Sequence, residues 1–216
     1  YARDMLESPG TPDAIIIGTD DHRTCPALYV ATVSPNPGQA LYIDAALLYH
    51  PWYRSWLLQR RPDLPVQDLP VKTISAILET PALRDTPVYL SNIFSKPSGR
   101  IPLVPEGLLL RVVPPHAPPD FVSPEALARR HLEATARISG TRADFQGADE
   151  PETDPFGANL WSHYALGARE LARNLEAAGR PDLAEEIASD ALSRGVTPIE
   201  LGHAPARPAR PAHVSD

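Results

Sequence analysis

The sequence predicts an α/β fold, in which a small parallel or mixed sheet is flanked by helices and followed by an α-helical region. Two observations predict it. Short apolar runs rich in β-branched residues alternate with helical periodicity in the first half of the chain, whereas the second half shows helical periodicity alone. The length of 216 residues is enough to bury a core. We expect an α/β domain over residues 1–113 and a helical region over 124–202.

The α/β domain begins with a strand, a helix and a second strand. A short helix over 1–8 precedes AIIIG, residues 14–18, whose consecutive β-branched residues are typical of a strand buried on both faces. A short helix around 26–33, with Pro26 in its first turn, leads to a second strand in ALYID, residues 40–44. This order favours a right-handed parallel crossover.

Two helices and two strands complete the domain. Residues 52–61 have aromatic residues at helical spacing, and 71–80 has apolar residues three to four positions apart before Pro81. The segments TPVYLSN, residues 86–92, and GLLLRVV, residues 107–113, are expected to be further strands.

A proline-rich segment over residues 114–123 lies between the two halves, and its composition is typical of a stiff linker. Ser123 is a suitable N-cap and Pro124 a suitable first helical residue, so a helix should run from there to about Ile138. Because such a linker supplies neither a continuous helix nor a central strand, we expect the α/β unit and the helical hairpin that follows to form separate contact clusters joined through the helix at 124–138.

A helical hairpin is expected over residues 159–194. Gly179 would end its first helix and Pro181 would begin its second. The pattern resembles one tetratricopeptide repeat, in which small residues let two helices approach closely. The acidic stretch over 140–155 is expected to be mobile, and the proline, alanine and arginine tail over 203–216 to be disordered.

Composition restricts the class of function. The formal net charge of -7 disfavours a nucleic-acid partner, which requires a clustered basic surface. No apolar run reaches the roughly 20 residues that cross a bilayer. The one cysteine, Cys25, excludes an internal disulfide and a cysteine-rich zinc site. Since the chain starts at Tyr1 and its one methionine is Met5, we expect a soluble segment of a longer protein.

The TDDH turn, residues 19–22, is the first candidate site. The sequence has no glycine-rich phosphate loop, HExxH, GxSxG or paired CxxC motif. Asp20 and Asp21 follow a predicted strand, where they could hold a hard cation bridging a sugar-nucleotide phosphate, with His22 as acid or base. The alternative is that these residues cap the next helix and solvate a turn. We favour that structural interpretation and assign no catalytic residue, metal ligand or cofactor.

The segment HPWYRSW is the second candidate. His50, Trp52 and Tyr53 could stack on a sugar ring while Arg54 contacts an acid or phosphate, or the aromatic residues could plug the edge of the sheet. We expect Trp56 to be buried and Tyr53 to lie at the rim of a cleft shared with the TDDH turn. A Tyr53 in the core would remove the case for this composite site.

Residues 1–114 also resemble a known family. The segments YARDML, AIIIGTDDHRTCPALY, ALYIDAALLYHPWYRSWLLQRRPDLP, TPVYLSN and LVPEGLLLRVVP follow one another as in the soluble C-terminal region of large bacterial multi-spanning membrane proteins. Those proteins are similar to protein O-mannosyltransferase-like enzymes of the GT-C class. In the family an acidic, asparagine-containing turn and an aromatic-rich helix follow the first strand, whereas here the turn is TDDHRTC and the helix has Tyr29 alone.

The resemblance implies a function for the parent protein. GT-C enzymes take a sugar from a polyprenyl-phosphate donor, and their catalytic carboxylate lies in an early loop of the membrane region, which this chain lacks. The chain would then be a non-catalytic domain at the periplasmic face of the inner membrane. Its partners would be the transmembrane region of the parent chain and a polypeptide or glycan acceptor, with membrane contact through the upstream region.

Two alternatives stay open. The first is a metal-assisted enzyme that acts on a phosphorylated or nucleotide-linked sugar through Asp20, Asp21 and His22. The second is a protein-interaction scaffold that docks a partner helix on the hairpin.

Overall fold

The computed structural model describes residues 1–19, 21–33, 39–64, 66, 69, 74–91, 101–141, 144 and 155–202. Its helices, strands and 3-10 turns (η) are, in chain order, α1 (Ala2–Glu7), β1 (Ile15–Gly18), α2 (Asp21–Val33), β2 (Leu41–Asp44), η1 (Leu47–Tyr49), α3 (Pro51–Arg60), α4 (Ile74–Leu78), η3 (Pro81–Leu83), β3 (Val88–Leu90), β4 (Leu103–Glu106), β5 (Leu109–Val112), η4 (Pro119–Val122), α5 (Pro124–Thr135), α6 (Pro155–Ala177) and α7 (Pro181–Ser193).

The described strands form a five-stranded mixed sheet in the order β2-β1-β3-β5-β4. β1 is parallel to β2 and β3, with Ile15 opposite Leu41 on one side and opposite Val88 on the other. β5 runs antiparallel to both β3 and β4. The predicted α/β fold class is confirmed, and the sheet is mixed.

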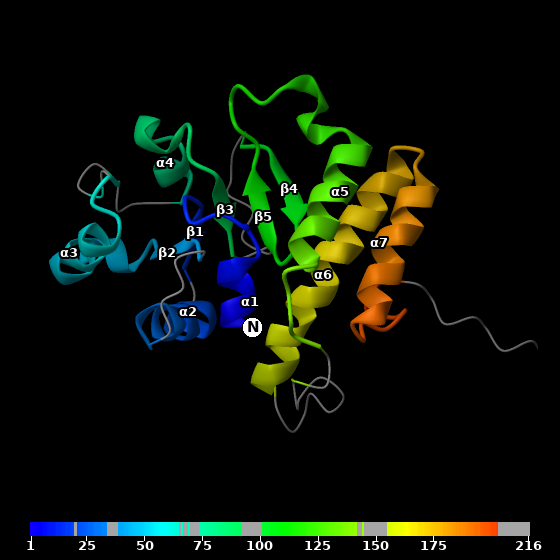
Figure 1. The fold of residues 1–216 in the computed structure, drawn as a ribbon, viewed down its shortest axis with the longest axis horizontal. Coiled ribbons are helices and arrows are strands. Elements are labelled where there is room, and N and C mark those ends of the chain that lie inside the picture. Colours follow the sequence, from blue (N-terminus) through cyan, green and yellow to red (C-terminus); the bar gives the residue numbers. More distant parts are fainter. Residues whose placement is uncertain are drawn as a thin grey trace, which may run out of the picture.

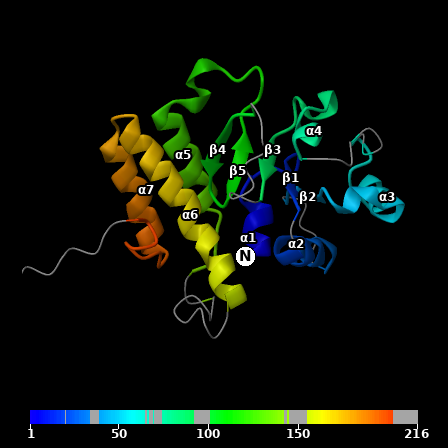
Figure 2. The ribbon, with the colours of Figure 1, turned by 180° about the vertical axis from the view of Figure 1, so that it is seen from behind.

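Helices cover both faces of the sheet, as Figures 1 and 2 show. Side chains alternate along β1, so Ile16 faces a cluster that includes residues of α1, α2, α5 and α6, while Ile15 and Ile17 face a cluster with residues of α3 and α4. All three isoleucines are fully buried. β1 is therefore covered on both faces, as its sequence predicts.

Several predicted helix boundaries are confirmed. The Ser123 hydroxyl accepts a hydrogen bond from the backbone N–H of Ala126 at 3.3 Å, and Pro124 begins α5. Gly179 has φ of 75°, and it separates α6 from α7 in an antiparallel hairpin (Figure 1). The start of α2 was predicted wrongly, because this helix begins at Asp21 and contains Pro26 in its interior.

Strand β4 was not singled out as a separate strand. It pairs with β5 in a hairpin whose turn contains Gly107, with φ of 59°. Its sequence, LVPE, has a proline and a carboxylate among four residues. Pro105 is tolerated because β4 is an edge strand, where one side of the ladder has no partner strand.

The expectation of separate contact clusters is wrong. One apolar cluster contains Met5 and Tyr89 of the α/β unit together with Trp161, Leu171 and Ile187 of the hairpin. The physical reason is that α6 packs against β4 on one side and against α7 on the other. The proline-rich segment crosses outside this cluster, so it does not divide the core.

A buried carboxylate also joins the two halves. Asp4 of α1 is 3% exposed and accepts hydrogen bonds from Ser139 N and Oγ at 3.1 and 3.0 Å, from Gly140 N at 2.9 Å and from the Tyr164 hydroxyl at 2.7 Å. Four donors from residues more than a hundred positions away satisfy this charge. Hydrogen bonding therefore ties the first helix to α6.

The segments expected to be mobile or disordered fall mostly outside the described residues, which omit 142–143, 145–154 and 203–216. Among the helices of the described residues, none has the length and apolar character needed to cross a membrane.

Candidate functional site

The TDDH turn lies largely beyond what the structure describes. Asp20 is outside the described residues, and only the backbone of Asp21 and His22 is placed, in the first turn of α2. The described residues contain no group of three or more histidine, cysteine or acidic side chains able to hold a metal ion. Ligand binding by this turn stays a prediction.

The end of the neighbouring strand β2 is closed by hydrogen bonds. Asp44 is 3% exposed, and its Oδ1 accepts from the backbone N–H groups of Ala46 and Leu47 at 2.7 and 2.9 Å. Its Oδ2 accepts a hydrogen bond from the Thr24 hydroxyl of α2. This carboxylate, which sequence reasoning missed, thereby holds β2, α2 and η1 together.

Tyr53 lies in the core, so the prediction that it stands at a cleft rim is wrong. Its side chain is fully buried, and its hydroxyl accepts from Asp44 N at 2.9 Å and donates to Tyr42 O at 3.4 Å. Burial raises the pKa of the Tyr53 hydroxyl well above its usual value. The reason is that Tyr53 and Leu57, four residues apart, form the inward face of α3. Because Tyr53 is in the core, it cannot form a composite binding site with the TDDH turn.

The remaining residues of this segment divide into a packed set and an exposed set. Arg54 donates to the backbone carbonyls of Leu48, Val66 and Leu69 at 2.6, 2.8 and 3.0 Å, so its guanidinium is committed to the fold. Trp56 was expected to be buried but is half-buried, with Arg60 above its ring at 4.5 Å. His50 and Trp52 are exposed.

A groove of about 610 Å³ opens at the other end of the sheet, beside the start of β3. Its floor is formed by β3 and β5, one wall by α4 and η3, and the other by the segment from 113 to 122. Most of the lining is aliphatic or proline, and the residues used below are Leu78, Leu83, Val88, Val112, Phe121 and Val122. We name this cavity the proline-lined groove.

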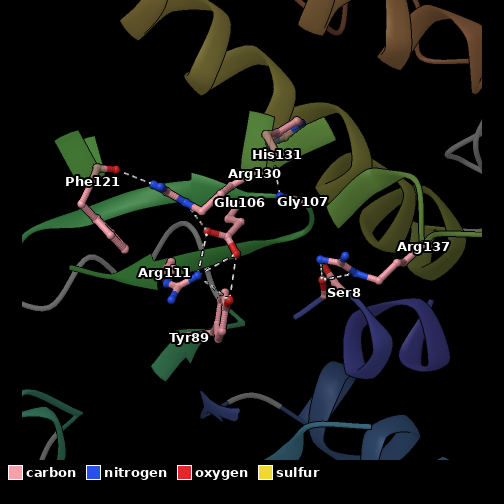
Figure 3. A network of polar contacts seen from close by, with 9 residues as sticks. All are labelled: Ser8, Tyr89, Glu106, Gly107, Arg111, Phe121, Arg130, His131 and Arg137. Carbon is pink, nitrogen blue, oxygen red and sulfur yellow. Dashed lines mark hydrogen bonds and ion pairs between the residues drawn. The ribbon is translucent and has the colours of Figure 1, made fainter. Parts of the chain in front are cut away.

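A buried ion-pair network stands behind one wall of this groove (Figure 3). Glu106, 4% exposed, accepts from the Tyr89 hydroxyl at 2.8 Å through Oε1. Arg111 Nη1 lies 3.3 Å from Oε1, and Arg130 Nε lies 3.1 Å from Oε2. Burial, reinforced by the charge of Glu106, raises the pKa of Tyr89, so this hydroxyl stays a donor.

The network holds Phe121 in the groove wall. The guanidinium carbons of Arg130 and Arg111 lie 4.2 and 5.1 Å from the centre of the Phe121 ring. Arg130 Nη2 also donates to the Phe121 carbonyl at 2.7 Å, as Figure 3 shows. Glu106 thus orients two arginines, and these fix the aromatic side chain and the backbone of the proline-rich segment.

A smaller cavity of about 250 Å³ shares Arg84, Thr86 and Pro114 with the proline-lined groove. Its charged lining consists of Arg84, Asp85 and Arg111. The apolar groove therefore continues into a polar end that presents charges of both signs.

Two buried histidines are structural. Gly107 N donates to Nδ1 of His131 at 3.2 Å, and burial lowers the pKa of His131 to about 4. Arg23 contacts the ring of His163, and burial, followed by the charge of Arg23, lowers the pKa of His163 to about 3. Both rings are therefore neutral at pH 7 and serve to pack the fold.

Comparison of the chain with family models, with curated proteins and with solved structures gave no match.

Proposed function

We propose that this chain is a non-catalytic domain of a membrane-embedded GT-C-like glycosyltransferase, and that it binds an acceptor polypeptide in the proline-lined groove. The groove is the observation that carries the binding function. Its volume of about 610 Å³ lies in the range of roughly 300–1,000 Å³ found for ligand sites. The resemblance of residues 1–114 supports the choice of parent protein.

The lining favours a polypeptide over a glycan. A glycan requires several hydrogen-bonding groups along its length, whereas the groove presents aliphatic side chains such as Leu78 and Val112 and the rings of several prolines. An extended polypeptide can place apolar side chains against these walls and its polar groups at the end that contains Arg84 and Asp85.

The shape of the groove is also fixed in the absence of a ligand. The proline-rich segment has few backbone donors, but Arg130 holds it through the Phe121 carbonyl. Proline fixes backbone angles, so less conformational entropy is lost when a ligand binds against this wall. These features support a binding site whose shape exists before the ligand arrives.

Selection of phage-displayed random peptides on the whole chain tests peptide binding. Val122 lines the groove and is 48% exposed, so Val122→Glu should leave the fold intact and weaken a selected peptide by about tenfold or more. Val33→Glu is the matched control, since Val33 is 59% exposed on α2 and lies outside the groove. Failure to select peptides, or equal binding to both variants, would overturn the groove assignment.

The link to a membrane enzyme has a separate test. The reading frame upstream of Tyr1 should encode many hydrophobic spans that end just before this chain. A reading frame that begins near Met5 without such spans would overturn the parent assignment and leave the groove assignment standing.

A further inference from the structure

Three exposed rings stand together where η1 meets α3. Tyr49 is 76% exposed, Trp52 is 59% exposed and His50 is exposed between them. The His50 ring stacks on Trp52 with centroids 6.3 Å apart and an interplanar angle of 25°, and Tyr49 meets His50 edge-on at 6.1 Å. We name Tyr49, His50 and Trp52 the aromatic platform.

The backbone beneath the platform is fixed by buried groups. Asp44 binds the start of η1, and Arg54 donates to the carbonyl of Leu48 at 2.6 Å. Trp52 contacts the ring of Tyr53 edge-on at 5.6 Å, and Tyr53 is itself locked in the core. The fold therefore holds three large rings in place without covering them, which packing alone does not require.

The chemistry of the three rings matches a sugar. Each ring has faces that can stack and a polar group at its edge: a phenol hydroxyl, the pair of imidazole nitrogens and an indole N–H. Among the described residues, no hydrogen bond engages these three polar groups. A pyranose likewise has an apolar C–H face surrounded by hydroxyl groups.

Area and charge favour a small, uncharged occupant. A covered aromatic side chain buries about 150–250 Å², so the exposed parts of Tyr49 and Trp52 amount to on the order of 300 Å². A standard protein interface needs about 800 Å² on each partner. Arg54 is committed to three backbone carbonyls, so it is not available to a phosphate or carboxylate. The platform fits a small, uncharged ligand.

We propose that the aromatic platform binds one ring of a neutral sugar. None of its residues lines the proline-lined groove, so the inference does not rest on the proposed function. One stacked ring gives weak binding, with a dissociation constant on the order of 1–10 mM, because so small a ligand makes few contacts.

Saturation-transfer difference NMR of the whole chain with glucose, galactose, N-acetylglucosamine and cellobiose tests this proposal. At least one sugar should receive saturation through its C–H face, and Trp52→Ala should weaken its binding about fivefold or more. Trp52→Phe should retain part of the binding. Tyr29→Ala is the matched control, because Tyr29 is 66% exposed on α2 and should leave the signal unchanged.

Thermal unfolding of each variant verifies its fold, and Tyr49→Ala provides a second test should Trp52→Ala not fold. No transfer to any of the four sugars, or equal transfer in the wild type and Trp52→Ala, would overturn the proposal. Retention of the chain on phosphatidylcholine vesicles, or self-association, that Trp52→Ala abolishes would instead assign the platform to a lipid surface or a second copy, and would overturn the sugar site as well.

Discussion

Two buried carboxylates, Asp44 and Glu106, each end a strand of the same sheet, yet their partners differ. Asp44 accepts hydrogen bonds from the backbone of Ala46 and Leu47 and from the Thr24 hydroxyl. Glu106 is satisfied by two arginines and a tyrosine, one of the arginines from α5. Both side chains are nearly inaccessible to solvent.

The difference shows what each carboxylate builds. Donors two and three residues away produce a tight turn, so Asp44 closes its end of the sheet. Arg130 of α5 pairs with Glu106 and also holds Phe121. Glu106 thereby positions the wall of the proline-lined groove. Both carboxylates lie at the carboxyl ends of their strands, yet Asp44 closes a local turn, whereas the partners of Glu106 extend to Phe121 in the groove wall.

The largest expected effect is that of Glu106→Ala, which should lower the free energy of unfolding by about 3–5 kcal/mol because two partly buried arginines lose their counter-charge. Denaturant unfolding measures the loss. Glu125→Ala is the control: Glu125 is an exposed carboxylate that pairs with Arg180, and its removal should cost at most about 1 kcal/mol. Equal losses in the two variants would contradict the role of Glu106.

Acid should destabilise both carboxylate networks, because a buried histidine lies next to each of them. His131 binds Gly107, beside Glu106, and His163 contacts Arg23, beside Thr24. Both pKa values are lowered on folding, to about 4 and about 3, so the unfolded chain binds more protons below its histidine pKa of about 6.5. Stability should therefore fall with a slope of about 0.7 kcal/mol per pH unit for each histidine at pH 6.5, rising to about 1.4 near pH 5.

Urea unfolding between about pH 6.5 and 5, above the range of ordinary carboxylates, measures this slope. His131→Gln should remove the contribution of one histidine and leave the other. A stability that stays constant or rises as the pH falls through this window would show that neither histidine is held neutral.

Asp44→Ala should have a smaller effect, about 1–3 kcal/mol, because it removes hydrogen bonds without leaving a charge unpaired. Asp44→Asn keeps one carbonyl oxygen for Ala46 and Leu47 and should cost less. Denaturant unfolding of the two variants, compared with that of Glu106→Ala, measures the difference between the two carboxylates. A loss of unfolding free energy larger than that of Glu106→Ala would show that Asp44 contributes more to stability than Glu106.

The smallest expected effect is that of Phe121→Leu, about 1 kcal/mol, because the two arginines lose an aromatic face but the Phe121 carbonyl remains. Phe121→Tyr retains the face and should be neutral. Unfolding gives the stability, and binding of a selected peptide gives the effect on the groove. If Phe121→Leu leaves peptide affinity unchanged, the ion-pair network does not contribute to binding in the groove.

Much of the fold could be predicted because many of its elements have a local cause. Three β-branched residues specify β1, Ser123 and Pro124 specify the start of α5, and Gly179 and Pro181 specify the hairpin turn. The prediction of separate clusters is wrong because a proline-rich segment on the surface does not keep the regions that flank it apart. The packing of α6 on β4 depends on contacts that no local pattern reports.

The candidate sites were harder to predict. Helical spacing permits two inward faces for α3, one with Trp52 and Trp56 and one with Tyr53 and Leu57, and it cannot choose between them. The choice depends on Asp44 N, which binds the Tyr53 hydroxyl. The groove was missed because its wall is a segment read as a linker, although Phe121 among the prolines is a signal that could have drawn attention to it.

The carboxylate of Asp4 has a consequence for how the chain is made. Its donors come from Ser139, Gly140 and Tyr164, so α1 leaves the ribosome long before the groups that will satisfy its charge. Its apolar side chains can pack earlier, because α1 contacts α2 and Met5 shares a cluster with Ile16. Completion of the fold is thereby deferred to the emergence of α6, and in a shorter nascent chain Asp4 lacks the donors that it has in the folded protein.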